Sequence, residues 1–338
     1  MVRRLADSRV VRTTVGVAVV VAAFAWALPS FASYGDVWRT LQETDRRFAL
    51  PLLLVAAANL VAPALLQRAA LPGLGLRNAV LVDWMTSAVT NTVPGGSAVA
   101  VGMTWSMYRR LRLANAAIAR AIVVTGVWDQ IVKLSAPLAA VVWLATERPL
   151  GPGLVQAAAA GAVLFAVVVG LCVMLVAGPG AARALGALAD RLPFTGSGWG
   201  DRLEQLRADT VALVRSRWRG LTLWTIGGHL NLFLLLLLCL RALRVDDTAL
   251  TAAAVFAALA FGRLVTALPL TPGGLGVMEV GLTSALAAVG TADEAAVVAA
   301  VLLFRFVTFA LPIPLGAVAA VAWATDEQDE PTNTAALA

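Results

Sequence analysis

Long apolar runs separated by short charged connections dominate the pattern along this chain. Each run approaches or exceeds the roughly 20 residues that an α-helix needs to span the hydrocarbon core of a bilayer. The pattern therefore predicts an all-α, polytopic integral membrane protein. About six full transmembrane helices are expected, at residues 13–33, 48–68, 117–146, 153–178, 220–243 and 294–324.

Two further apolar segments are interrupted by proline and paired glycines. The first covers residues 78–108 and is broken by Pro-Gly-Gly at 94–96, and the second covers 248–289 and is broken by Pro-Gly-Gly at 272–274. Proline cannot donate to the helix hydrogen-bond ladder, and neighbouring glycines weaken it. Each segment is therefore expected to form a broken, re-entrant hairpin of two short helices that meet at a turn inside the membrane.

The two interrupted segments occupy equivalent places in two halves of the chain. Pro94 and Pro272 are 178 residues apart (272 − 94), and a full span precedes and follows each hairpin. This order is the sequence trace of an inverted repeat, an arrangement typical of transporters. If each hairpin returns to the side on which it begins, the first opens from the cytoplasm and the second from the outside. We therefore expect the two turns to converge at mid-membrane depth.

The charged segments give the expected domain organisation and orientation. Residues 1–325 form one transmembrane domain, in which the arginine-rich segment 180–219 is a cytoplasmic linker between the repeats, partly an amphipathic helix at the interface. Residues 326–338 are acidic, lack an apolar pattern and are expected to be disordered. A cytoplasmic N-terminus puts 17 arginines inside and six outside, which is the bias of the positive-inside rule.

Composition excludes several classes of function. Hydrophobic residues make up 60% of the chain and charged residues 14%, where soluble domains carry about 25%. A soluble enzyme is thereby excluded, and the net charge of +6 fits anionic lipid headgroups better than nucleic acid. Two cysteines, Cys172 and Cys239, and a single histidine, His229, give no cluster at metal-ligand spacing. No metal or cofactor is expected.

The two glycine turns are candidate substrate-binding elements. Each brings the N-terminus of a short helix into the membrane, where free backbone N–H groups and the positive end of the helix dipole favour an anion. Glycine lets a phosphate group approach the backbone closely. A single Pro-Gly-Gly sequence is as well explained by a helix kink, and the second copy favours a binding role. The candidate residues of the turns are Pro94, Gly95, Gly96, Ser97, Pro272, Gly273, Gly274 and Gly276.

Ionisable residues inside the predicted membrane segments are costly unless they are paired or face water. Asp129 and Lys133 stand four residues apart with the acid first, so they are expected to form a structural pair. Glu279 lies in the second half of its hairpin, where Arg305 or Arg263 could pair with it. Because an arginine near two helix N-termini can bind a phosphodiester in bidentate geometry, these three residues are assigned to substrate binding.

Three other polar residues receive structural interpretations. Asp83 lies near the mouth of the first hairpin and is expected to be a solvated cap. His229 and Asn231 are expected to hydrogen-bond to neighbouring helices. The sequence offers no candidate constellation for Ser-His-Asp nucleophilic chemistry.

Three stretches carry a resemblance to a known family. Residues 272–279 (PGGLGVME), 94–96 (PGG) and 305–314 (RFVTFALPIP) are similar to the flippase-like transmembrane region of the lysylphosphatidylglycerol synthase family, over about residues 13–324. The resemblance implies translocation of a lipid or lipid-linked headgroup between leaflets. It is to a stand-alone membrane domain without the aminoacyltransferase domain of the full-length synthases, so synthesis of a lysyl-lipid is not expected.

Together these features predict translocation of an anionic phospholipid or a polyprenyl-phosphate-linked headgroup between the leaflets of a bacterial plasma membrane. The expected partner is a membrane lipid rather than nucleic acid, with a second copy of the chain or a partner synthase as further candidates. Enzyme activity is not expected. Two alternatives remain open: a membrane enzyme acting on prenyl-phosphate sugars, for which Asp246 and Asp247 are the adjacent external acids, and a non-transporting accessory protein.

Overall fold

The computed structural model describes residues 45–93, 95–147, 149, 151–177, 180, 190, 198–265, 272–274, 276–289 and 293–329. All regular structure in these ranges is helical, which confirms the all-α fold. The main helices are α4 (Ala49–Ala70), α5 (Leu76–Thr92), α6 (Gly96–Arg110), α7 (Asn115–Glu147), α8 (Pro152–Ala177), α10 (Trp199–Ala242), α11 (Ala252–Val265), α12 (Val277–Val289), α13 (Glu294–Arg305) and α14 (Pro312–Asp329). Three short turns, η2 (Arg46–Phe48), η3 (Pro272–Gly274) and the π-helical η4 (Phe306–Ala310), complete the described elements.

Four helices of the described part are long and apolar enough to cross a membrane. They are α4 with the turn before it, α7, α10, and the continuous α13, η4 and α14. These helices coincide with four of the expected spans, and α8 occupies the place of the span expected at 153–178. The span expected at 13–33 lies outside the described residues.

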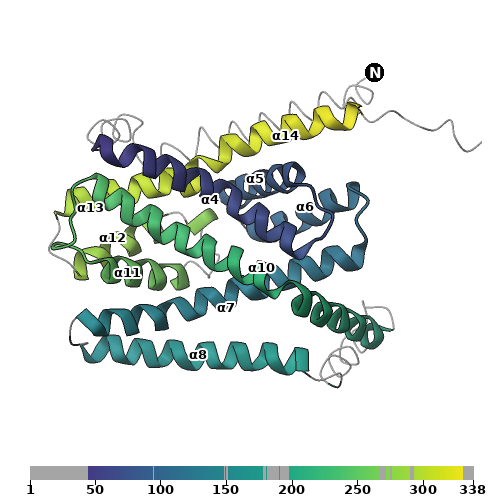
Figure 1. The fold of residues 1–338 in the computed structure, drawn as a ribbon, viewed down its shortest axis with the longest axis horizontal. Helices are drawn as coiled ribbons and strands as arrows, with labels where there is room; N and C mark the ends of the chain where they lie inside the picture. The colour runs from purple at the N-terminus through teal and green to yellow at the C-terminus, as the bar shows by residue number, and fades with distance from the viewer. Residues whose placement is uncertain are drawn as a thin grey trace, which may run out of the picture.

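The two interrupted segments form broken hairpins, α5–α6 and α11–α12. The long helices run roughly horizontally in Figure 1, where α5–α6 opens towards the right and α11–α12 towards the left. The turns of both hairpins lie between these two ends. The hairpins therefore point towards each other from opposite ends of the bundle, as the inverted repeat predicts.

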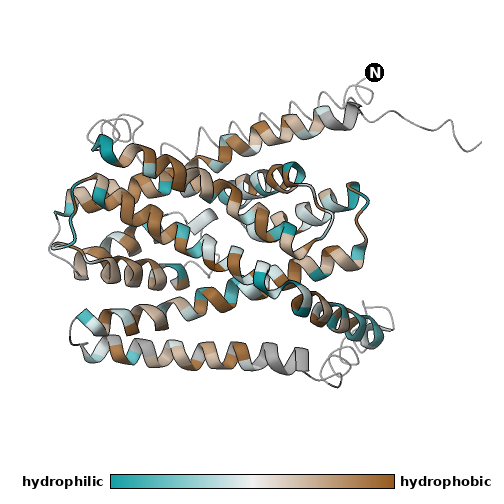
Figure 2. Cartoon of the chain, in the orientation of Figure 1, coloured by the Kyte–Doolittle hydropathy of each residue, from teal (hydrophilic) through white to brown (hydrophobic). Residues whose placement is uncertain are grey.

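Polar residues collect at the two ends of the helices, and apolar residues fill the zone between them (Figure 2). At the end where α5 begins, the helix ends and connections carry Arg68, Arg77, Arg110 and Arg112, and the basic first half of α10 lies there too. At the opposite end, where α11 begins, acidic residues accompany the arginines of the connections. Large apolar side chains on the outside of the bundle, such as Leu53 and Val142, are 67% and 68% exposed.

The helices of the two halves pack against each other in exchanged pairs. α5 of the first hairpin packs along α14, and its counterpart α11 packs along α7. The helices α4 and α10, which precede the hairpins, pack along each other. If α4 is matched with α10, α5 with α11, and α7 with α13–α14, the contact of α5 with α14 corresponds to that of α11 with α7. The contact between α4 and α10 then corresponds to itself. Such an exchange is the packing expected of a two-fold repeat.

Small residues allow the closest of these helix contacts. A Cβ placed on Gly316 of α14 would clash with the Cβ of Ala88 and lie 2.6 Å from the carbonyl oxygen of Trp84, both in α5. A Cβ on Gly220 of α10 would lie 3.5 Å from the Cβ of Ala69 in α4. Membrane helices gain no hydrophobic free energy from leaving lipid for one another, so close backbone approach supplies the dispersion contact that holds them together.

Helices extend beyond the expected boundaries at two places. α10 is a single helix of 44 residues, so the linker expected at 180–219, partly as an amphipathic helix, is continuous from residue 199 onwards with the span that follows it. Asp209 in this stretch lies 3.7 Å from Arg120 of α7, which ties the extension to the bundle. At the other end of the chain, α14 includes residues 326–329, which were expected to be disordered. Residues 330–338 lie outside the described residues.

Candidate functional site

The first hairpin turns on glycine backbone geometry. α5 ends at Thr92, and Gly95 adopts a left-handed φ of 67° before α6 begins. The amide of Gly96 donates to the carbonyl of Val93 at 2.8 Å. A Cβ on Gly96 would clash with the carbonyl of Val89 in α5, so only glycine fits there. The turn thereby presses the N-terminus of α6 against the C-terminal end of α5.

The second turn, η3, also depends on glycine residues with left-handed backbone angles. Gly273 and Gly274 adopt φ values of 56° and 73°, and Gly276 follows with 75°. A Cβ on Gly273 would overlap the ring of Phe309, lying 2.7 Å from its Cδ2 atom. Glycine is therefore required at this tip because an aromatic ring from the last membrane helix covers it.

The two turns meet through Asn91, which lies one residue before the end of α5. Its Nδ2 donates to the carbonyl of Phe309 at 3.0 Å, and a Cβ on Gly273 would lie 3.0 Å from its Oδ1. Phe309 belongs to η4, a π-helical turn, and such turns offset carbonyl groups from the regular α-helical ladder. One asparagine thus joins the first hairpin, the second turn and the last membrane helix.

Arg305 fixes the second turn from the side of α13. Its Nε donates to Oε1 of Glu279 at 2.5 Å, and its Nη2 donates to the carbonyl oxygen of Gly273 at 3.0 Å. The guanidinium carbon lies 4.7 Å from the centre of the Phe309 ring, a cation–π distance. The arginine and glutamate side chains are only 10% and 14% exposed. Of the two partners considered for Glu279, the structure selects Arg305.

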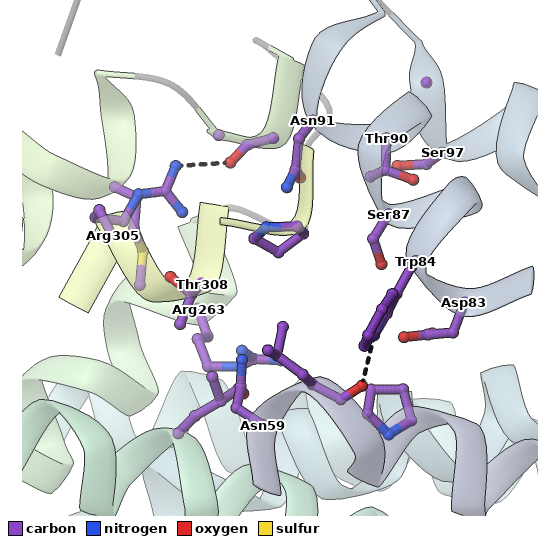
Figure 3. Close-up of a pocket in the computed structure, with 18 of the residues that line it drawn as sticks. Asn59, Asp83, Trp84, Ser87, Thr90, Asn91, Ser97, Arg263, Arg305 and Thr308 are labelled. Carbon is purple, nitrogen blue, oxygen red and sulfur yellow. Dashed lines mark hydrogen bonds between the residues drawn. The ribbon is translucent and has the colours of Figure 1, made fainter. Parts of the chain in front are cut away.

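A cavity of about 570 Å³ opens beside the two turns (Figure 3). This volume lies in the range of small-molecule binding sites. Its walls come from both halves of the chain: α4, α5, the start of α6 and α7 on one side, and α10, α11, η3, α12 and α13 to α14 on the other. Its polar and charged lining residues are Asn59, Asp83, Trp84, Ser87, Thr90, Asn91, Ser97, Gln130, Lys133, Arg263, Arg305 and Thr308.

Basic groups outnumber acidic ones on the cavity wall. Lys133, Arg263 and Arg305 line it, against Asp83 as the one carboxylate among its lining residues. The Nζ of Lys133 lies 2.8 Å from Oδ2 of Asp129, which confirms the predicted pair. Lys133 nevertheless also faces the cavity, so the pair is part of the site's surroundings and not only a buried structural contact.

Most residues assigned to substrate binding from the sequence lie together at this cavity. Gly95, Gly96, Ser97, Gly273, Gly274, Arg263 and Arg305 all line it. Glu279 lies behind Arg305, outside the lining, and Gly276 is exposed away from it. Pro94 lies outside the described residues, and Pro272 begins the η3 turn.

A polar stripe on α5 is the part of the site that sequence reasoning missed. Asp83, Ser87 and Asn91 recur every four residues, with Trp84 and Thr90 beside them, and all five line the cavity. Residues three and four apart share one face of a helix, so this spacing was an available signal. Asp83, expected to be a solvated cap at the hairpin mouth, belongs instead to the cavity wall.

Two other interhelical contacts follow the sequence expectation. Nε2 of His229 in α10 lies 3.1 Å from Oδ1 of Asp129 in α7, and Nδ2 of Asn231 donates to the carbonyl of Val55 in α4 at 3.2 Å. These bonds join three helices around the cavity. Among the described residues, no group of three or more His, Cys, Asp and Glu side chains has the arrangement of a metal site.

Asp246 and Asp247, the adjacent acids on which an enzymatic function would depend, have separate partners. Asp246 accepts hydrogen bonds from the hydroxyl and amide of Thr248, and Asp247 lies 2.6 Å from Arg241. Arg241 also donates to the carbonyls of Val245 and Leu250, so both carboxylates stabilise the connection between α10 and α11. The two carboxylates thus have structural contacts within this connection.

Comparison with known proteins places this architecture in a family. The family model described as the lysylphosphatidylglycerol synthase TM region matches residues 13–316, a range that contains every residue lining the cavity. No curated protein matches the chain. Since the family match extends over most of the sequence and over both hairpins, the chain belongs to the family of the lysylphosphatidylglycerol synthase transmembrane region.

Proposed function

We propose that this protein translocates the headgroup of an anionic phospholipid or of a polyprenyl-phosphate-linked lipid between the leaflets of the plasma membrane. The observation that carries the proposal is the meeting of two glycine turns, from opposite ends of the bundle, at one cavity with three basic side chains. Membership of the family supports a membrane-embedded role, and the chemistry of the cavity supports a phosphate-bearing substrate.

Phosphate recognition follows from the groups at the cavity wall. The start of α6 reaches the wall at Gly95, Gly96 and Ser97, where the positive end of the helix dipole attracts an anion. Arg305 approaches from α13 and contacts the second turn, and a guanidinium group can hold two phosphate oxygens at once. Binding there would replace the water that solvates the headgroup, while the acyl chains stay in the surrounding lipid.

Alternating access would use the repeat. One hairpin opens towards each end of the bundle, so separating one hairpin from its packing partner exposes the cavity to one side, and separating the other exposes it to the opposite side. The arginine-rich end of the helices would face the cytoplasm, in keeping with the positive-inside rule. No covalent step is needed, so the proposal is for a transporter and not an enzyme.

Reconstitution tests this proposal directly. Purified protein in vesicles that contain acyl-chain-labelled fluorescent phosphatidylglycerol should accelerate exchange of the label between leaflets, measured by the fraction that a membrane-impermeant reductant can quench. A polyprenyl phosphate labelled on its lipid chain serves as the second substrate. Arg305→Gln should lower the rate at least about tenfold, because one strong charge-assisted interaction is worth about that factor.

A surface arginine provides the matched control. Arg217 is exposed on the N-terminal extension of α10, so Arg217→Gln makes the same chemical change away from the cavity and should leave the rate unchanged. Equal rates for protein-containing and empty vesicles with both lipids, or equal rates for wild type and Arg305→Gln, would contradict the proposal.

A further inference from the structure

A cluster of ionisable side chains extends from the cavity wall into the helices behind it. Asp129 of α7 lies at its centre: Nζ of Lys133 is 2.8 Å from its Oδ2, and Nε2 of His229 in α10 is 3.1 Å from its Oδ1. Arg263 of α11 is close enough to act electrostatically on Asp129. Lys133 and Arg263 line the cavity, whereas Asp129 and His229 are not among its lining residues. The cluster thus connects the cavity surface to the one histidine of the chain.

One carboxylate is shared by the lysine and the histidine, because each of its oxygens has a different partner. A carboxylate only accepts hydrogen bonds, so Nε2 of His229 carries the hydrogen and Nδ1 keeps a lone pair that can take up a proton. The side chains of Lys133 and His229 are only 16% and 13% exposed. A charge at membrane depth is costly without an opposite charge beside it, so departure of the ammonium group from Asp129 favours a proton on the imidazole.

The cations that act on His229 belong to the cavity wall. In the described part of the chain, the charged groups that act electrostatically on its imidazole are Asp129, Lys133 and Arg263. The other elements packed against α10, which are α4, α8, α13 and η2, add no such group there. Lys133 and Arg263 both line the cavity, so an anion bound to them offsets the repulsion that opposes a positive charge on the imidazole.

We propose that His229 is a proton-binding site and that proton uptake there accompanies entry of a phosphate headgroup into the cavity. This inference rests on the proposed translocation and adds its energy source. A phosphate that binds Lys133 draws the ammonium group away from Asp129, and the imidazolium form of His229 replaces it as the partner of the carboxylate. A hydronium ion supplies the proton and becomes water, and the lone pair of Nδ1 forms the new N–H bond. Release of the headgroup reverses both changes.

One proton for each singly charged headgroup keeps the charge of the cluster constant. Lys133 and Arg263 contribute positive charges and Asp129 a negative one, and a phosphodiester together with its proton adds one charge of each sign. The loaded and empty states therefore have the same net charge, and the membrane potential does no work on their exchange. Headgroup and proton cross together, so a proton gradient drives the lipid towards the less acidic side. With a more acidic exterior, this direction is from the outer to the inner leaflet.

An imposed pH gradient tests the coupling, with phosphatidylglycerol as the probe. Vesicles would contain the protein and a trace of acyl-chain-labelled lipid, with the interior about one pH unit more acidic than the exterior and the potential clamped by valinomycin and equal potassium. The outer leaflet should then hold up to about ten times as much label as the inner one, measured with a membrane-impermeant reductant, because one pH unit is a tenfold ratio of proton activity. Equal pH, with or without a potassium diffusion potential, should give an even distribution.

A variant without the imidazole separates the two proposals. His229→Gln keeps an N–H group that can donate to Asp129 but does not titrate, so it should exchange the lipid at equal pH and lose the accumulation. Asn231→Ala is the matched control, because it breaks a hydrogen bond from the same helix to the carbonyl of Val55 without changing a titratable group, and it should retain the accumulation. An even distribution for wild type under the gradient, or accumulation that persists in His229→Gln, would overturn the proton site and leave translocation standing.

Proton uptake by the wild type keeps the test independent of whether the variant folds. Glycerophosphoglycerol, the soluble headgroup phosphodiester of phosphatidylglycerol, would be titrated into the detergent-solubilised protein near neutral pH. Calorimetry in buffers of different ionisation enthalpy measures binding and the number of protons taken up, which should reach about one per bound headgroup. Binding without proton uptake would overturn the proton site. If wild type exchanges no lipid at equal pH and the headgroup does not bind, the translocation proposal fails, and the proton site that rests on it fails too.

Discussion

Gly273, at the tip of the second hairpin, lies against Asn91 of the first, although the two residues are 182 positions apart in the chain (273 − 91). The same asparagine holds the carbonyl of Phe309, whose ring covers the glycine. The centre of the molecule is thus a contact between the two repeats, and the cavity opens beside it.

Replacing Gly273 at this contact should destabilise the protein more than replacing Gly276, which follows in the same hairpin. Gly273→Ala places a methyl group into the Phe309 ring and also strains a left-handed φ, so we expect a loss of about 2–4 kcal/mol in unfolding free energy. Gly276→Ala has an equally left-handed φ but meets nothing within 4 Å, so its loss should be about 1 kcal/mol. Thermal unfolding in detergent compares them, and equal losses would refute the packing argument.

Breaking the Glu279–Arg305 pair should destabilise the protein more than removing both charges. Glu279→Gln leaves a largely buried guanidinium without its carboxylate, for which a loss of about 3 kcal/mol is expected. The double variant Glu279→Gln with Arg305→Gln should recover part of that loss, because no uncompensated charge remains. A double-mutant cycle on denaturant unfolding measures the coupling, and strictly additive losses would show that the pair contributes nothing.

The contact of α5 with α14 should depend on Gly316. Gly316→Ala drives a methyl group into Ala88 and the backbone of Trp84, so a loss of about 1–3 kcal/mol and a lower transport rate are expected. Gly281→Ala in α12 is the matched control, since nothing lies within 4 Å of the position that its methyl group would take and alanine favours helix by about 1 kcal/mol. Stability that is equal or higher in Gly316→Ala would disprove close packing at this point.

Acid should loosen the connection between α10 and α11. Hydrogen bonds from the Thr248 hydroxyl and from the backbone of Ala249 and Thr248 hold the pKa of Asp246 below its usual value. A lowered pKa in the folded state stabilises the fold above the unfolded value of about 3.9 and loses that effect as pH falls through the folded pKa. As the pH falls below about 4, the unfolding temperature of the wild type should therefore fall more steeply than that of Asp246→Ala.

The neighbouring carboxylate is the control for that titration. Asp247 is 73% exposed and contacts Arg241, so Asp247→Asn should preserve the difference in acid sensitivity between wild type and Asp246→Ala. Parallel pH profiles for wild type and Asp246→Ala would contradict the assignment of the acid effect to Asp246.

Several elements of the fold could be predicted from the sequence because they depend on local properties. Apolar length located α4, α7, α8 and α10, and the Pro-Gly-Gly sequences located both hairpin turns. The pairing of Glu279 with Arg305 was among the expected options because isolated charges are costly in a membrane. The position of Asp83 on the cavity wall was not predicted, since it depends on how helices from both halves pack around α5.

The basic stretch 199–219 shows that a charged connection can be continuous with a membrane helix. Its arginines indicated a partly helical connection outside the membrane, and within it Glu204 pairs with Arg207 one turn later at 2.9 Å, and Gln205 bonds to Asp209. Such pairs stabilise a helix in water. The chain therefore continues as helix from the aqueous side into the membrane, and a length of about 66 Å, at 1.5 Å per residue, gives α10 room for both.

The exchanged packing of the hairpins makes the two halves mutually dependent. α5 packs against α14 from the C-terminal half, and α11 packs against α7 from the N-terminal half. A fragment that ends after α7 would thus expose the face of α5 that α14 covers, and the complementary fragment would expose the face of α11. Each half covers an apolar helix face of the other half. Fragments made as separate chains would therefore have to associate before either could form a stable bundle.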